Sequence, residues 1–322
     1  MNDLFSGMEY VYAVYKEKSF SAAAKKLFIS QPSLSASVRR VEERLGSPIF
    51  DRSTKPLSLT DCGQHYIRSV EQIMAIQSDF SAYLNDWSEL KTGSLMLGGS
   101  SLYSSQVLPS IIRKFSREFP GVQVGLIEGN SEQLHAMLQE GTLDIIMDNF
   151  TLDPYVYDHL FYKRERLFLA VPKKFEINRR MEQYAISAAD IASGPESWAQ
   201  HRPVPLIEFV NEPFIFLKPE NDTGKRARMF CSNAGFVPNV LFELDQQMTS
   251  YQISRSGLGI SFLSDTLISR ISDSEKVIYY PVDPGSSQRR LSLYWKRGHY
   301  QSRAMEEFIR VAEQCREPSY LE

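Results

Sequence analysis

The sequence predicts an α/β protein that begins with a winged helix-turn-helix, continues through one long helix and ends in a larger α/β domain. Three observations support this fold class. Two short helical patterns joined by a turn occupy residues 19–46, a proline-free helical pattern follows, and strand and helix patterns then alternate to the end of the chain. We therefore expect domains at residues 1–60, 61–91 and 92–322.

The helix-turn-helix begins with a helix over about Phe20–Leu27, whose small alanines let a second helix approach closely. The second helix spans about Pro32–Leu45. Ser30 or Gln31 can cap it, and proline suits its first position because the missing N–H costs nothing there. Its buried stripe is spaced at steps of four and three residues and consists of Leu34, Val38, Val41 and Leu45.

The opposite face of the second helix is small, polar and basic. Because a helix-turn-helix places its second helix in the major groove of DNA, we expect DNA contacts from Ser30, Gln31, Pro32, Ser33, Ser35, Ala36, Arg39 and Arg40. Two short extended runs then flank residues 52–55. This wing would place Arg52 and Lys55 beside the phosphate backbone. The alternative is a helix pair that does not bind DNA. Charge gives only mild support, with nine Lys/Arg against seven Asp/Glu in residues 1–62.

The order of these motifs resembles the N-terminal domain of LysR-type transcriptional regulators. The matching residues are Phe20-Ser21, Ala23-Ala24, Leu27, Ser30 to Ser35, Val41-Glu42, Leu45-Gly46, Ile49-Phe50, Arg52, Leu59-Thr60 and Gly63. The resemblance implies a cytoplasmic DNA-binding regulator with base contacts at Gln31, Pro32, Ser35 and Ala36. The family often has arginine where this chain has Ala36, so one guanine-reading side chain is missing. Arg39 or the wing would compensate.

The long helix carries a heptad pattern interrupted by one glutamine: Tyr66, Val70, Ile73, Gln77, Phe80, Leu84 and Trp87. About thirty residues at about 1.5 Å each give a rod on the order of 45 Å. We expect the same helix of a second subunit to cover this stripe, which would present two recognition helices to an operator with dyad symmetry. The alternative is packing against its own chain. The resemblance further implies tetramers, and RNA polymerase is another expected partner.

The remaining chain alternates strands and helices and predicts a parallel sheet. The expected strands are Ser94–Gly98, Val122–Ile127, Leu143–Met147, Leu167–Val171, Phe214–Leu217, Val240–Leu244, Gly257–Leu263, Val277–Tyr280 and Leu291–Trp295. Residues 175–205 show no clear secondary-structure pattern. This part resembles the LysR-type effector domain, which is built like a small periplasmic binding protein with two lobes. That resemblance implies lobe I at about 92–162 and 268–322 and lobe II at about 163–267.

Open α/β sheets bind ligands beyond the C-terminal ends of their strands and at helix N-termini. A small-molecule effector, as an anion or carboxylate, would therefore contact Ser100, Ser101, Asn130, Ser131, Thr223, Gln246, Met248 and Phe262. The alternative for the Ser, Asn and Thr side chains is ordinary helix capping.

Other function classes find little support. The chain has no Gly-rich phosphate loop, no GxSxG and no HExxH, and its three cysteines are far apart, so we expect no enzyme, metal or cofactor. No apolar run reaches the ~20 residues of a membrane span, and the N-terminus does not read as a secretory signal. The alternative function is a solute-binding protein or enzyme with a non-functional helix-turn-helix, against which the missing signal and missing catalytic spacing argue.

Overall fold

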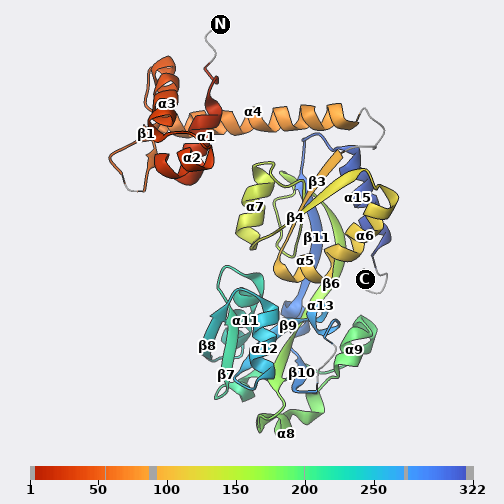
Figure 1. Ribbon diagram of the computed structural model, residues 1–322. Coiled ribbons are helices and arrows are strands. Elements are labelled where there is room, and N and C mark those ends of the chain that lie inside the picture. The colour runs from red at the N-terminus through yellow and green to blue at the C-terminus, as the bar shows by residue number, and fades with distance from the viewer. Residues whose placement is uncertain (1–3, 55, 87–92, 199, 272–274, 317–322) are drawn as a thin grey trace. The chain divides into compact units, whose positions relative to one another are not determined.

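The computed structural model describes residues 4–54, 56–86, 93–198, 200–271 and 275–316, and for residues 78, 79 and 81–86 it describes the backbone alone (Figure 1). Lys55, Trp87 and the side chain of Leu84 therefore lie outside the described residues. The chain forms two compact units, Met1–Ser81 and Ala82–Glu322. No helix in the described part is long and apolar enough to cross a membrane.

The first unit is a winged helix-turn-helix, as predicted. It contains α1 (Met8–Glu17), α2 (Phe20–Lys26), α3 (Gln31–Leu45), β1 (Phe50–Asp51), β2 (Ser58–Leu59) and the start of α4 (Asp61–Asp86). Strands β1 and β2 pair antiparallel and form the wing. The core lies between the helices and includes Val11, Val14, Ala23, Leu34, Val38, Val41 and Val70.

Helix α4 changes its surroundings along its length. Tyr66 and Val70, which open the predicted heptad pattern, are buried in the core of the first unit. Further along, Met74, Ile76 and Phe80 are exposed, the last two by 67% and 59%. The first part of the stripe thus packs against its own chain, while the later part carries large apolar side chains on the surface.

Lobe I of the second unit contains a mixed rather than a purely parallel sheet. Its strands are β3 (Gly93–Gly99), β4 (Val122–Glu128), β5 (Ile145–Asp148) and parts of β6 (Tyr157–Pro172) and β11 (Gln288–Lys296). β3 pairs in parallel with β4 and β5, whereas β11 is antiparallel to β5 and β6. The helices are α5 (Ser101–Gln106), which the sequence did not predict as a separate helix, α6 (Leu108–Glu118), α7 (Ser131–Gln139) and α15 (Arg303–Gln314).

Lobe II is built around the end of β6. Its strands are β7 (Pro213–Leu217), β8 (Asn239–Leu244), β9 (Ile260–Ser264) and β10 (Val277–Pro281). The main helices are α11 (Asp222–Asn233), α12 (Gln247–Arg255), α13 (Asp265–Ile268) and α14 (Pro284–Ser287). The segment without a clear sequence pattern, residues 175–205, forms short helices: α8 (Ile177–Met181), η1 (Glu182–Tyr184), α9 (Ala188–Ala192), α10 (Pro195–Trp198) and, just after it, η2 (Leu206–Phe209).

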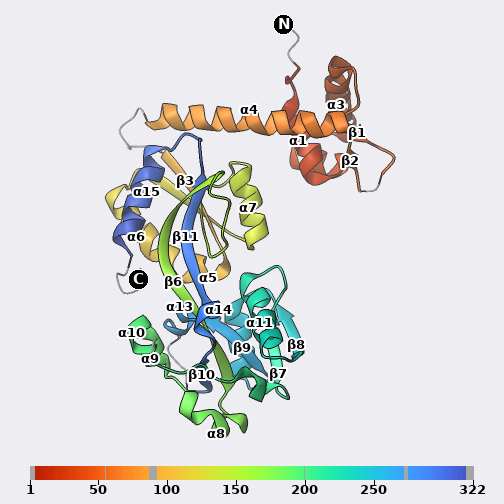
Figure 2. The same cartoon turned by 180° about the vertical axis from the view of Figure 1, so that it is seen from behind.

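Two long strands, β6 and β11, connect the lobes and run side by side between them (Figures 1 and 2). β6 pairs with β11 from Tyr157 to Arg166 and then with β9 and β10 in lobe II. We expected lobe I to resume at about residue 268, and this position is wrong. β10 still belongs to lobe II because it pairs with β6 and buries Val277 and Tyr279 there, so the return is along β11.

Candidate functional site

The start of α3 presents an exposed polar surface. Ser30 caps the helix, its side chain accepting a hydrogen bond from the Ser33 backbone N–H at 3.3 Å. The hydroxyl of Ser21 donates to Oε1 of Gln31 at 3.1 Å. The predicted contact residues on this helix are all exposed except Ser35, which is half-buried: Ser30, Gln31, Pro32, Ser33, Ala36, Arg39 and Arg40. Their exposure follows from the burial of the opposite stripe in the core.

Glu42 on α3 holds the wing in place. One of its carboxylate oxygens accepts the backbone N–H groups of Ile49 and Phe50 at 2.9 and 3.3 Å. Its other oxygen pairs with the guanidinium of Arg52 at 3.0 Å, and that guanidinium lies 5.1 Å from the centroid of the Phe20 ring. The Arg52 side chain is still 48% exposed. Arg52 thus fixes the wing as well as offering a charge at the surface.

Gly63 shows why the wing must be followed by a glycine. A Cβ at this position would lie 2.1 Å from the carbonyl oxygen of Ile49. Thr60 stabilises this close contact with two hydrogen bonds. Its hydroxyl donates to the Pro48 carbonyl at 2.6 Å and accepts the Gly63 N–H at 2.9 Å. Thr60 and Gly63 therefore hold the start of α4 against Pro48 and Ile49, the segment that follows α3.

The sequence reading did not single out Phe28. This residue lies in the turn between α2 and α3, has a φ of 56° and is 96% exposed. A bulky side chain in the left-handed region is rare and is associated with functional sites. A large apolar residue inside a helix-turn-helix turn is the feature that could have identified it.

A narrow cavity of about 50 Å³ lies in the cleft between the two lobes. It is lined by Ser100 and Ser101 at the start of α5 and by Gln246 and Met248 at the start of α12. The Gln246 side-chain amide donates to Oε1 of Glu128 at 3.2 Å, which joins lobe II to lobe I. Ligand pockets usually measure about 300–1,000 Å³. The lobes must therefore separate before this cleft admits a metabolite.

A second cavity of about 240 Å³ also has walls from both lobes. Ser131, Asp148 and Phe150 come from lobe I, while Glu220 and Lys225 come from lobe II. The Lys225 ammonium lies 5.3 Å from the centroid of the Phe150 ring. Burial raises the pKa of Asp148, although its carboxylate accepts the N–H groups of its two following residues.

Five polar residues that we call the hinge cluster lie buried where β6 and β11 pass between the lobes: Tyr103, Glu165, Thr223, Thr266 and Arg289. Glu165 accepts hydrogen bonds from the Tyr103 hydroxyl and from Nε of Arg289, both at 2.8 Å, and from the Thr266 hydroxyl. Nη1 of Arg289 donates to the Thr223 hydroxyl at 2.8 Å and to Asp222 at 3.1 Å. The cluster thus ties α5 of lobe I to α11 and α13 of lobe II through the crossing strands.

Electrostatics in the hinge cluster favour the charged form of Glu165 despite its burial. Burial opposes the charge of Glu165, but Arg289, Lys163 and the hydrogen bonds outweigh it, so the pKa of Glu165 is lowered. Asp265, next to the cluster, behaves differently. Burial raises its pKa to about 6, although Lys163 lies 4.0 Å away and its carboxylate accepts the Arg166 N–H.

Comparison with known proteins agrees with this geometry. Residues 5–64 match the family described as bacterial regulatory helix-turn-helix protein, lysR family, and residues 88–316 match the LysR substrate binding domain. The chain belongs to the LysR-type transcriptional regulators. It is therefore a DNA-binding transcriptional regulator with an effector-binding domain and not an enzyme, as predicted.

The relatives of this LysR-type regulator match it along nearly its whole length. It is 26% identical over 315 residues to the uncharacterized HTH-type transcriptional regulator YcgK of Bacillus subtilis, covering 98% of this chain and 95% of that protein. It is 24% identical over 309 residues to CbbR of Rhodospirillum rubrum, covering 95% of both chains. Solved structures with the same fold include a full-length OxyR variant of Pseudomonas aeruginosa (TM-score 0.64, 19% identity, 95% and 93% coverage). Another is CbnR complexed with its target DNA (TM-score 0.59, 16% identity, 96% and 99% coverage).

The predicted effector residues of the regulator fall into three groups. Ser100, Ser101, Gln246 and Met248 share the narrow cavity, and Ser131 lines the second one. Asn130 forms a capping box with Gln133 at the start of α7, and Thr223 belongs to the hinge cluster, so both have structural partners. Phe262 does not reach the cleft. It is buried in the lobe II core because its side chain faces α11, against Phe214, Phe216 and Phe230.

The hinge cluster is the main feature that the sequence reading missed. Glu165 stands next to the apolar strand residues 167–171, and Arg289 precedes the apolar run of β11. The available signal for an ion pair was that an acidic and a basic residue lie just before two predicted strands. Their pairing could not be predicted because the four consecutive charged residues Lys163 to Arg166 of β6 do not resemble a buried strand.

Proposed function

We propose that this regulator binds an operator with dyad symmetry as a dimer, with one α3 helix from each subunit in the major groove. Base contacts come from Gln31, Pro32, Ser35 and Ala36. Gln31, Pro32 and Ala36 are exposed, and Ser35 is half-buried on the same face. Arg39 and Arg40 lie one to two turns further along the same exposed face and suit phosphate contacts. Arg39 pairs with Glu43 at 3.2 Å, but both side chains are well exposed, so this pair costs little to break.

The dimer contact that we propose is the exposed apolar part of α4. Ile73, Ile76 and Phe80 recur at steps of three and four, and they are half-buried or exposed in the isolated chain. Large apolar patches on a helix surface are typical of protein interfaces. We further propose that two dimers form a tetramer, and that the regulator works in the cytoplasm on double-stranded DNA together with RNA polymerase.

The effector site that we propose is the narrow cavity in the cleft. The observation that carries this proposal is that residues from both lobes, Ser100 and Ser101 against Gln246 and Met248, line one cavity. We expected an anion or carboxylate, but among the described residues lining this cavity none is basic. Hydroxyl and amide groups instead suit a small, uncharged polar molecule.

The effector acts, in this proposal, by changing the lobe arrangement. A ligand that enters the cleft replaces the contact between Gln246 and Glu128, so it binds the open and closed arrangements with different affinity. Only such a difference can shift the equilibrium between them. The shift would alter how the two recognition helices are spaced on the operator.

DNA binding is tested by footprinting the DNA that flanks the protein's own coding region. We expect a protected site with dyad symmetry for the wild type and altered or lost protection for Ser35→Arg, which places a bulky charge on the base-reading face. The matched control, Ser232→Arg, adds the same group to an exposed position of α11 and should protect like the wild type. Equal protection by all three proteins would show that α3 does not read this DNA.

The effector site is tested with a reporter gene fused to the protected promoter. Ser101→Trp fills the cavity, so the reporter should no longer respond to growth conditions that change its output with the wild type. DNA binding of purified Ser101→Trp should remain normal, and the control Ser232→Trp should respond fully. A normal response from Ser101→Trp would place the effector elsewhere.

A further inference from the structure

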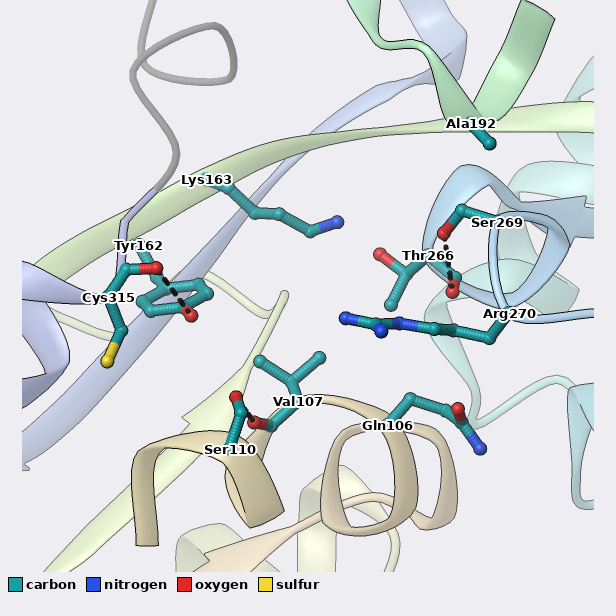
Figure 3. Close-up of a pocket in the computed structure, with 10 residues that line it drawn as sticks. All are labelled: Gln106, Val107, Ser110, Tyr162, Lys163, Ala192, Thr266, Ser269, Arg270 and Cys315. Atoms are coloured by element: carbon teal, nitrogen blue, oxygen red, sulfur yellow. Dashed lines mark hydrogen bonds between the residues drawn. The ribbon is translucent and has the colours of Figure 1, made fainter. Parts of the chain in front are cut away.

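A separate cavity of about 480 Å³ lies beside the hinge and has walls from both lobes (Figure 3). Val107 and Ser110 come from the junction of α5 and α6 in lobe I, Lys163 comes from β6, and Ser269 and Arg270 follow α13 in lobe II. It shares one lining residue, Gln106, with the effector cleft. It is therefore a third place where a molecule can touch both lobes.

The cavity is positively charged. Lys163 and Arg270 both line it, and no described lining residue is acidic. Figure 3 shows the ammonium of Lys163 and the guanidinium of Arg270 pointing into the same open space from different elements. This contrasts with the effector cleft, whose described lining contains no basic side chain.

The two cations differ in how far they are already neutralised. Lys163 is only 15% exposed and lies 4.0 Å from the buried carboxylate of Asp265, which offsets part of its charge. Arg270 is exposed, and within the described residues no carboxylate pairs with it. The hydroxyls of Ser110 and Ser269 already donate to the carbonyl oxygens of Val107 and Thr266. The guanidinium and the ammonium are thus the groups that recognise a ligand.

We infer that this cavity binds a small molecule carrying a phosphate group. A guanidinium can hold two phosphate oxygens at once and an ammonium can neutralise a third, which is the arrangement that phosphate recognition uses. A volume of about 480 Å³ lies in the range of metabolite pockets and exceeds what one inorganic ion fills. Because the two cations come from the crossing strand and from lobe II and the opposite wall from lobe I, a bound phosphate compound favours one lobe arrangement. The inference goes beyond the proposed function and does not depend on where the effector binds.

The test uses calorimetric titration of the full chain with two probes, inorganic phosphate and glycerol 3-phosphate, in chloride buffer of matched ionic strength. We expect wild-type binding to weaken about ten- to a hundredfold in Arg270→Gln, the effect of losing hydrogen bonds to a charged group. Ser110→Glu, on the lobe I wall, should weaken it comparably because it places a like charge in the cavity. Arg179→Gln removes the same charge from an exposed site elsewhere in lobe II and should bind like the wild type.

Tighter binding of glycerol 3-phosphate than of phosphate would identify an ester as the ligand class, whereas equal binding would identify the free ion; both support the site. Three results would overturn it. One is no binding of either probe by the wild type up to about 10 mM. Another is an equal loss of binding in Arg179→Gln. The third is unchanged binding in Ser110→Glu and in folded Arg270→Gln.

Discussion

Replacing Glu165 with glutamine tests whether the hinge cluster is an ion pair that stabilises the effector unit. Glutamine keeps the size of the side chain but removes its charge. Arg289 would then remain buried, with a side chain only 1% exposed and with Nη2 already lacking a hydrogen-bond partner among the described residues. Removing one member of a buried pair costs about 3–5 kcal/mol. Because Asp222 stays 3.1 Å from Nη1, we expect the lower end, about 3 kcal/mol of unfolding free energy.

A double-mutant cycle separates the ion pair from the loss of packing. Arg289→Met alone leaves Glu165 charged and buried, and should also be destabilising. The double variant leaves no charge uncompensated in that pair, so its cost should be smaller than the sum of the single costs by about 2 kcal/mol. Asp245→Asn serves as the control, since Asp245 pairs with Lys218 at the surface, where such a loss costs at most about 1 kcal/mol.

The assay is urea unfolding of the full chain in a Trp87→Phe background, so that the tryptophan fluorescence comes from Trp198 and Trp295 and reports on the effector unit. Far-UV circular dichroism follows the whole chain, so the transition of the DNA-binding unit can be distinguished. A cost below about 1 kcal/mol for Glu165→Gln, or strict additivity in the double variant, would refute the assignment of a buried, coupled ion pair.

Three further predictions concern single positions. Gly63→Ala should destabilise the DNA-binding unit by about 3 kcal/mol, because the added Cβ would lie 2.1 Å from the Ile49 carbonyl oxygen. Thermal unfolding of that unit measures this loss of stability, and an unchanged midpoint would contradict the packing argument. Burial raises the pKa of Asp265 from 3.8 to about 6, so the folded state holds a proton on this carboxyl that the unfolded state releases between these pH values. The unfolding free energy of the effector unit should therefore fall by on the order of 2–3 kcal/mol as pH rises from about 4 to about 6. Asp265→Asn should remove this part of the slope in urea titrations across that range, and an identical slope would disprove it. Glu42→Ala should weaken operator binding about tenfold in fluorescence anisotropy by releasing the wing, whereas Glu43→Ala should not; equal effects would mean that the wing does not depend on Glu42.

The DNA-binding unit could be predicted almost completely from the sequence because its interactions are local. The cap at Ser30, the buried stripe of α3 and the wing strands all follow from residues close in sequence. What could not be predicted is the partner of a charged side chain. Arg52 was expected to face DNA phosphates, yet it also binds Glu42, ten residues away in the chain.

The effector unit was harder to predict because its key contacts join distant segments. Ser100 and Gln246 could be placed in the cleft since both precede helices at strand ends. Thr223 met the same criterion, but its hydroxyl is used by Arg289, 66 residues away. The return to lobe I was misplaced because β10 and β11 look alike as short apolar runs, and only their pairing with different parts of β6 distinguishes them.

The pairing of β6 with β11 has a practical consequence for protein engineering. Arg166 of β6 and Gln288 of β11 lie opposite each other in the antiparallel pair, and the chain between them forms lobe II. Lobe II is thus a single insertion with adjacent junctions, so a chimera can exchange this lobe between related regulators while keeping the paired parts of both strands. Such a graft must retain Arg289 together with a matching acid at the position of Glu165, since the two lie on the strands that remain.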